Sequence, residues 1–217
     1  MYDFHNFGLS PIQELALNIL ILSVIIMSIL RGEKRIEESS PHAILALLAL
    51  FAISGRILLD PIPNVQPVTV IILLVGIFYG IPWALALSGI IALSTNLVFL
   101  GHGPWTLFQV AGWGLVGIIG ATLSNRLVLD GRLSVSRLMG VSVVSAFVFD
   151  WIVSLSILLN HEPSMLLPYL ANGIVFDLYH AVGNLIFVAW IATPLSEIMQ
   201  RHRLKASYRA VREVAIN

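Results

Sequence analysis

The sequence predicts an all-α membrane protein, a bundle of about seven transmembrane helices. Of its 217 residues, 58% are hydrophobic and 11% are charged, whereas soluble domains carry roughly 25% charged residues. The apolar residues gather in runs long enough for a helix to cross roughly 30 Å of hydrocarbon, and the basic residues occupy alternate connections between these runs. A soluble fold of this length could not bury so much apolar surface, but a bilayer accepts it.

Apolar runs bounded by polar breaks define the expected helices. In chain order they are Ile12–Leu30, Ala43–Leu59, Val68–Ile81, Trp83–Leu100, Trp105–Leu127, Leu138–Leu159 and Leu170–Ala192. The third and fourth are separated by a tight helix-breaking turn at Gly80-Ile81-Pro82. No basic segment precedes the first run and no cleavage pattern of small residues follows it, which favours a retained span over a signal peptide.

Basic residues predict the orientation, because short cytoplasmic loops retain Lys and Arg. Eleven of the 12 fall in every second connection or in the tail: Arg31, Lys34, Arg35, Arg126, Arg132, Arg137, Arg201, Arg203, Lys205, Arg209 and Arg212. We therefore expect the N-terminus outside and the C-terminus in the cytoplasm. The exception is Arg56.

The chain divides into three parts on this reading: residues 1–42 with the first helix and a cytoplasmic loop, a six-helix core at 43–194, and a basic tail at 195–217. The tail can form an amphipathic helix, with Leu195, Ile198, Met199 and Leu204 on one side. Such a helix is typical of a positively charged anchor along the lipid headgroups. A docking surface for a cytoplasmic partner is the alternative.

Charged residues inside a span cost a few kcal/mol, so each requires a partner or a function. Arg56, Asp150 and Asp177 all lie in the outer halves of their expected helices. On the last helix Asp177, His180 and Asn184 share one face, together with Gly173. These residues predict a polar pocket open to the outside, in which Arg56 and the aspartates orient a ligand. The alternative is a structural Arg–Asp pair, and His180 alone would favour interhelical hydrogen bonding.

The outer connections add polar and aromatic side chains at the same depth. Asn64 and Gln66 lie in the proline-rich segment 60–67, and Asn96 lies near the outer end of the fourth expected span. Trp105, Gln109 and Trp113 recur every four residues and form a stripe on the next helix. An interfacial tryptophan is usually a membrane anchor, which suits Trp105, whereas the deeper Trp113 suits packing against a flat ligand.

Small residues follow two neighbouring helices. They are Ala84, Ser88 and Ala92 on one, and Gly114, Gly117, Gly120 and Ala121 on the next. Such residues let helix backbones approach closely, which predicts internal packing, with docking against another membrane subunit as the alternative.

Missing motifs exclude several functions. There is no cysteine, so disulfides, thiolate metal sites and cysteine nucleophiles are excluded. The chain lacks a phosphate-binding loop, a G-x-S-x-G elbow and an H-E-x-x-H motif. Asp150 and Asp177 would form an intramembrane aspartate dyad only if they shared a proton, and Arg56 favours two ionised carboxylates instead. We expect no catalytic residue, metal, cofactor or nucleic-acid partner.

The stretch Ala43–Asn125 resembles the substrate-binding S components of energy-coupling factor (ECF) vitamin transporters. Three features carry the resemblance: Gly55-Arg56 before Asp60-Pro61, then Pro63-Asn64-Val65-Gln66-Pro67, and Gly101-His102-Gly103-Pro104-Trp105-Thr106 leading into Ala111-Gly112-Trp113-Gly114-Leu115-Val116-Gly117. The six spans from Ala43 onward match the six-helix core of these subunits, and Ile12–Leu30 is an addition. The family often carries an A-x-x-x-A docking surface, where this chain has alanines every three residues, at Ala43, Ala46, Ala49 and Ala52.

The resemblance implies a high-affinity binder of a vitamin in a prokaryotic plasma membrane. It would associate with a transmembrane coupling subunit and two cytoplasmic ATPase subunits, and it would not be an enzyme. The Gly-Pro-Trp-Thr segment is most similar to cobalamin (vitamin B12) S components. Riboflavin, pyridoxine-type and queuosine-precursor ligands remain open, as does a stand-alone secondary carrier with Arg56, Asp150 and Asp177 as an ion relay.

Overall fold

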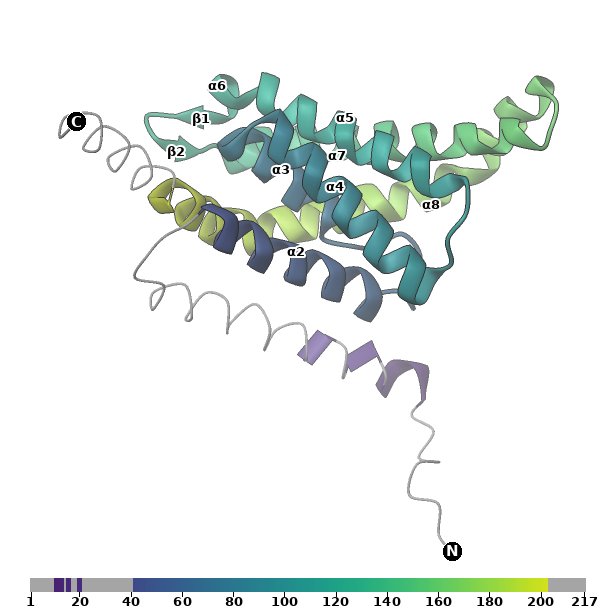
Figure 1. The fold of residues 1–217 in the computed structure, drawn as a ribbon, viewed down its shortest axis with the longest axis horizontal. Coiled ribbons are helices and arrows are strands. Elements are labelled where there is room, and N and C mark those ends of the chain that lie inside the picture. The colour runs from purple at the N-terminus through teal and green to yellow at the C-terminus, as the bar shows by residue number, and fades with distance from the viewer. Residues whose placement is uncertain (1–9, 14, 17–18, 21–40, 203–217) are drawn as a thin grey trace, which may run out of the picture.

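The computed structural model describes residues 10–13, 15–16, 19–20 and 41–202, which form an elongated bundle of helices (Figure 1). The main helices are α2 (Pro41–Leu58), α3 (Val68–Tyr79), α4 (Ile81–Thr95), α5 (Trp105–Thr122), α7 (Val135–Ser154) and α8 (Leu166–Phe187). Three continue without a break: α4 into the π-helix η2 (Asn96–Leu100), α7 into the 3₁₀ turn η3 (Leu155–Leu159), and α8 through the π-helix η5 (Val188–Ala192) into helical residues 193–202. The short elements are α6 (Ser124–Leu127), β1 (Val128–Leu129), β2 (Arg132–Leu133) and η4 (Pro163–Met165).

The chain is an all-α membrane protein. Within the described residues, four helical stretches are long and apolar enough to cross a bilayer: Ile81–Leu100, Trp105–Thr122, Val135–Leu159 and Pro163–His202. Two shorter apolar helices, Ala43–Leu58 and Val68–Tyr79, complete the bundle. Most of the predicted first span, the loop after it and residues 203–217 lie outside the described residues, so the count of seven spans stays a prediction.

Helix α3 is the core of the bundle, with every residue from Val68 to Phe78 buried. A helix that is apolar on all sides can face either lipid or other helices, and here other helices surround it, with α5 packed especially closely. A Cβ added to Gly120 would collide with the carbonyl oxygen of Leu73 on α3, and one added to Gly117 would collide with the side chain of Ala84 on the neighbouring helix α4. The predicted packing role is therefore confirmed for these two glycines.

Several helix boundaries differ from the expected ones: α7 begins at Val135 and α8 at Leu166, both earlier than expected, and the last helix continues past Ala192 to His202. Two further differences have a local cause. Helix α4 begins at Ile81, because Pro82 fits the first helical turn, where no backbone N–H is required. Helix α5 ends at Thr122, and the chain then forms α6 and a β-hairpin instead of continuing to Leu127. Asp130 and Gly131 at the hairpin tip have φ angles of 49° and 73°, the left-handed pair that a type I′ turn requires.

The bundle has two distinct ends. The connections 59–67, 101–104 and 160–165 form one, which we call the loop end, and the β-hairpin and residues 193–202 form the other, the hairpin end (Figure 1). Arg126, Arg132, Arg137 and Arg201 lie at the hairpin end, whereas Arg56 lies near the loop end. The bundle therefore separates Arg56 from the other described arginines, as the charge pattern predicts.

Candidate functional site

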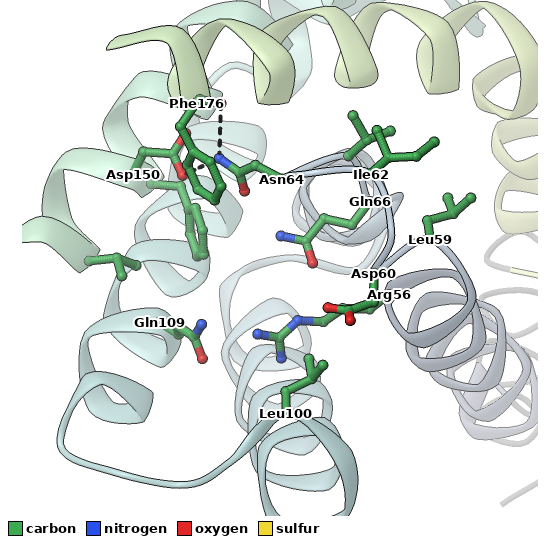
Figure 2. A pocket seen from close by; sticks show the side chains of 13 residues that line it. Arg56, Leu59, Asp60, Ile62, Asn64, Gln66, Leu100, Gln109, Asp150 and Phe176 are labelled. Carbon is green, nitrogen blue, oxygen red and sulfur yellow. Dashed lines mark hydrogen bonds between the residues drawn. The ribbon is translucent and has the colours of Figure 1, made fainter. Parts of the chain in front are cut away.

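A cavity of about 280 Å³ opens at the loop end, and we call it the Arg56 cavity (Figure 2). Its lining comes from α2, segment 59–67, η2, α5, α7 and α8: Arg56, Leu59, Asp60, Ile62, Asn64, Val65, Gln66, Leu100, Gln109, Phe149, Asp150, Val153 and Phe176. Ligand cavities typically combine an apolar wall with a few convergent polar groups. This lining has that composition.

Segment 59–67 folds into the end of the bundle. Asn64 adopts a φ of 58°, a left-handed conformation that asparagine tolerates better than most residues. Val65 packs on α8 at Gly183, where an added Cβ would lie 3.2 Å from the Val65 side chain. The absence of a side chain at Gly183 thus lets the segment approach α8 and direct Asn64 and Gln66 toward the cavity (Figure 2).

Arg56 is held in place by polar groups around η2. Its Nη1 donates to Thr95 Oγ1 and to Asn96 Oδ1, the latter at 3.1 Å. The Asn96 Nδ2 donates in turn to Thr106 Oγ1 at 2.8 Å and to Gln109 Oε1 at 2.6 Å. Asn96 is 2% exposed, so it acts from behind the cavity wall and positions Arg56 and Gln109.

Trp113 lies beneath Arg56. The guanidinium carbon is 5.0 Å from the ring centroid, within cation–π range. The indole also stacks on Phe149 at a centroid distance of 4.6 Å, and its Nε1 donates to Thr69 Oγ1 at 3.2 Å. Trp113 is fully buried and does not line the Arg56 cavity, so its ring supports the guanidinium from within the protein.

A chain of hydrogen bonds continues from Trp113 into α8 and α7. His180 Nε2 lies 2.8 Å from Thr69 Oγ1, and His180 Nδ1 lies 2.9 Å from Asp150 Oδ2. Trp113 is only a donor, so Thr69 Oγ1 accepts from it and is free to donate its own proton to Nε2. With Nδ1 protonated toward Asp150, a neutral His180 then satisfies every bond in the chain.

Asp150 ends this chain at the cavity wall. Its Oδ1 accepts from Asn64 Nδ2 at 2.9 Å, and the same amide nitrogen lies 3.3 Å from the Phe176 carbonyl oxygen. The alternative reading, a structural Arg–Asp pair, is not formed within the described residues, where Asp150 Oδ2 contacts His180 Nδ1. Distance explains the difference, because Thr95 and Asn96 hold the guanidinium on the α4 side.

Thr69, His180 and Asp150 have the connectivity of a Ser-His-Asp triad. Thr69 is fully buried, however; its oxygen accepts from Trp113, and the residue does not line the Arg56 cavity. A nucleophile requires access to its substrate, so this arrangement is a structural relay. It fixes the helices that carry the cavity.

A second cavity of about 590 Å³ adjoins the first, and we call it the Asp177 cavity. It is lined by Trp105, Asp150, Val153, Ser154, Ser156, Tyr169, Asn172, Gly173, Phe176 and Asp177. The two cavities share Asp150, Val153 and Phe176 as a common wall. The Asp177 Oδ2 accepts from Trp151 Nε1 at 3.1 Å, so the two aspartates of the site have different donors.

Seven of the eleven predicted site residues line the two cavities: Arg56, Asn64, Gln66, Trp105, Gln109, Asp150 and Asp177. Asn96, Trp113 and His180 stand behind the wall and hold it. Asn184 lies apart, because its Nδ2 donates to the Ser142 carbonyl at 3.0 Å between α7 and α8.

Sequence reasoning missed Thr95, Phe149 and Phe176. The two phenylalanines flank predicted aspartates in the sequence, but apolar side chains in an apolar helix carry no signal of their own. Thr95 directly precedes Asn96 at the start of the π-helical stretch, and only the fold shows that both face Arg56.

These features define an α-helical membrane protein with a polar cavity at the loop end of its bundle. A family model described as DUF6580, a family of unknown function, matches residues 37–206, and the chain belongs to that family. No curated protein and no solved structure matches the chain.

Proposed function

We propose that this protein is a membrane-embedded binding subunit that captures a small polar molecule at the loop end of the bundle. The observation that carries the proposal is the Arg56 cavity, into which buried Arg56 and Gln66 project (Figure 2). Neither the Gln66 amide nor the Arg56 Nε and Nη2 has a hydrogen-bond partner among the described residues. Polar groups held in an apolar wall without partners provide orientation for a ligand.

Preorganisation supports a binding role. Asn96 fixes Arg56 and Gln109, and the relay through Thr69 and His180 fixes Asp150. A ligand that enters such a site orders few side chains, so less of its interaction energy is lost as conformational entropy.

The resemblance to S components supplies the wider proposal. The helices from α2 onward would be the six-helix binding core in a prokaryotic plasma membrane, with the loop end and the N-terminus outside and the C-terminus in the cytoplasm. A coupling subunit and two ATPase subunits would provide the energy. Cobalamin remains a proposed ligand, but cavities of about 280 and 590 Å³ favour the smaller riboflavin, pyridoxine-type or queuosine-precursor ligands.

Equilibrium binding to the purified chain in detergent tests the proposal. Without ATP or partners, one vitamin of a broad panel is expected to raise the melting temperature and to bind with a micromolar or lower Kd. Gln66→Ala is expected to weaken the binding of that vitamin ten-fold or more, a loss of about 1.4 kcal/mol in binding free energy. Gln200→Ala at the hairpin end is the matched control. A folded chain that binds no vitamin contradicts the proposal.

A secondary carrier is the second candidate, favoured by the buried polar residues that continue along α8 from His180 to Asn184. Asn184 Oδ1 and Ser145 Oγ on α7 are both buried and lack a partner in the described chain. Reconstitution of the chain alone in liposomes distinguishes the two functions. Gradient-driven flux without partners would favour the carrier, and binding without flux favours the binding subunit.

A further inference from the structure

The two cavities carry buried charges of opposite sign, and the protein supplies each charge with only some of the hydrogen-bond partners that it can take. Arg56 is 8% exposed and uses one of its three guanidinium nitrogens, Nη1, in hydrogen bonds, all to neutral side chains. Within the described residues no carboxylate lies within 4 Å of it. Asp60 lines the same cavity but is solvent-exposed. The Nε and Nη2 edge is therefore available to an acceptor.

The Asp177 cavity holds the complementary group. Asp177 is 4% exposed, and only its Oδ2 has a hydrogen-bond donor, Trp151. No cation lies within 4 Å of its carboxylate among the described residues. Asp177 and Gly173 line this cavity together, and Asp177 Oδ1 is the one atom within 4 Å of a Cβ added to Gly173, at 3.9 Å.

Asp150 differs from both. It lies in the common wall, and its two oxygens are matched by His180 and Asn64. Arg56 on one side of the wall thus has only the exposed Asp60 as a counter-charge, and Asp177 on the other side has no cation within 4 Å among the described residues. A buried charge without a counter-charge is costly in a membrane, and such a group is a functional site by default.

We propose that the ligand is dipolar and lies across both cavities. An anionic group, a carboxylate or a phosphate, accepts from the free guanidinium edge of Arg56, whose planar fork matches either group. A cationic amine donates to Asp177 Oδ1. A flat body joins the two and passes along Phe176 in the common wall, where Gln66 and Gln109 reach its polar edge (Figure 2). This inference rests on the proposed binding function and specifies its ligand.

Two sets of matched probes test it on the purified full-length chain. One contains pyridoxamine 5′-phosphate, pyridoxamine, pyridoxine 5′-phosphate and pyridoxine, and the other contains tryptophan, tryptamine, indole-3-propionate and 3-ethylindole. Each set holds a dipolar, a cationic, an anionic and a neutral member. In at least one set the dipolar member is expected to bind ten-fold or more tightly than each of the others. The set in which the dipolar member is preferred shows whether the anionic group of the ligand is a phosphate or a carboxylate.

Substitutions assign each charge. Asp177→Asn should reduce the ratio of the affinities for the dipolar and the anionic member to under three-fold. Arg56→Gln should reduce the ratio of the affinities for the dipolar and the cationic member to under three-fold. Arg132→Gln, an exposed arginine of the hairpin, should change neither. Asp177→Asn keeps an acceptor for Trp151, so it should leave the melting temperature of the ligand-free chain unchanged or raise it.

Equal binding of neutral and dipolar members would overturn the dipolar ligand while leaving the proposed function intact. A lower melting temperature of the ligand-free Asp177→Asn variant would overturn it too, because Asp177 would then be a structural charge. If no probe binds, mass spectrometry of the molecule that copurifies decides: a dipolar molecule supports the inference and any other overturns it. A chain that carries and binds nothing refutes the proposed function itself.

Discussion

His180 Nδ1 lies 2.9 Å from Asp150 Oδ2, and this contact joins α8 to α7 behind the Arg56 cavity. His180 is fully buried, and its other nitrogen contacts Thr69 at the start of α3. One imidazole thereby links three helices, and Asn64 extends the link to segment 59–67 through the second oxygen of Asp150. The cavity wall depends on this relay.

Asp150→Ala tests the relay. The change leaves the buried His180 N–H without its acceptor, which costs about 1–3 kcal/mol, and leaves the Asn64 amide with only the Phe176 carbonyl oxygen at 3.3 Å. We expect the free energy of unfolding to fall by about 2–4 kcal/mol and the melting temperature in detergent to fall with it. Asp150→Asn keeps an acceptor and should lose less. Asp130→Asn at the exposed hairpin tip is the control, and equal stability of all three variants would contradict the relay.

Asn64 combines a backbone and a side-chain role, and two substitutions separate them. Asn64→Gly keeps access to the φ of 58° but removes the amide that bonds Asp150. Asn64→Ala removes the amide and adds left-handed strain of about 1 kcal/mol. Both should weaken ligand binding, and alanine should also lower the melting temperature further than glycine. If the Asn64→Gly variant binds the ligand with wild-type affinity, the Asn64 amide has no role in the cavity.

Close packing of α5 on α3 predicts a difference between two glycines. Gly120→Ala places a Cβ against the Leu73 backbone, and such overpacking should cost about 1–3 kcal/mol. Gly140→Ala on α7 meets nothing within 4 Å, so the better helix propensity of alanine should leave stability unchanged or raise it. Thermal unfolding of the two variants measures the difference, and equal melting temperatures would argue against the packing.

Orientation can be measured by labelling, because the chain has no cysteine of its own. His161→Cys and Arg132→Cys place single thiols at exposed positions of the loop end and the hairpin end. In intact cells an impermeant maleimide should label His161→Cys only, and Arg132→Cys should react after lysis. The reverse pattern would place the cavities on the cytoplasmic side.

Much of the core was predictable because apolar length and helix breakers act locally. The expected helices overlap α2, α3, α4 with η2, α5, α7 with η3, and α8, and Pro82 and Gly80 mark the turn between two of them. The Asp130-Gly131 turn carries a hairpin signal as strong as any in the sequence. It was missed because the connection between the helices expected to end at Leu127 and to begin at Leu138 was interpreted only through its basic residues.

The site was predictable as a set of residues at one depth, but not as a set of contacts. Spacing places Asp177, His180 and Asn184 on one face, yet whether Asp150 bonds Arg56 or His180 depends on helix rotation. The π-helical turn at Asn96 and the packing of Val65 on Gly183 decide that rotation and the position of segment 59–67. Neither feature has a local sequence pattern, so the hydrogen bonds that join Thr69, His180 and Asp150 could be identified only from the folded structure.

The central claim is that a small molecule occupies the loop-end cavities. Native mass spectrometry of the freshly purified chain tests it most directly, with Val153→Phe as a variant that fills the common wall and Val144→Phe, on a 59% exposed side chain, as its control. The wild type and Val144→Phe should carry one small molecule per chain, and Val153→Phe should carry none. The same molecule retained by Val153→Phe, or none on the folded wild type, would contradict the account.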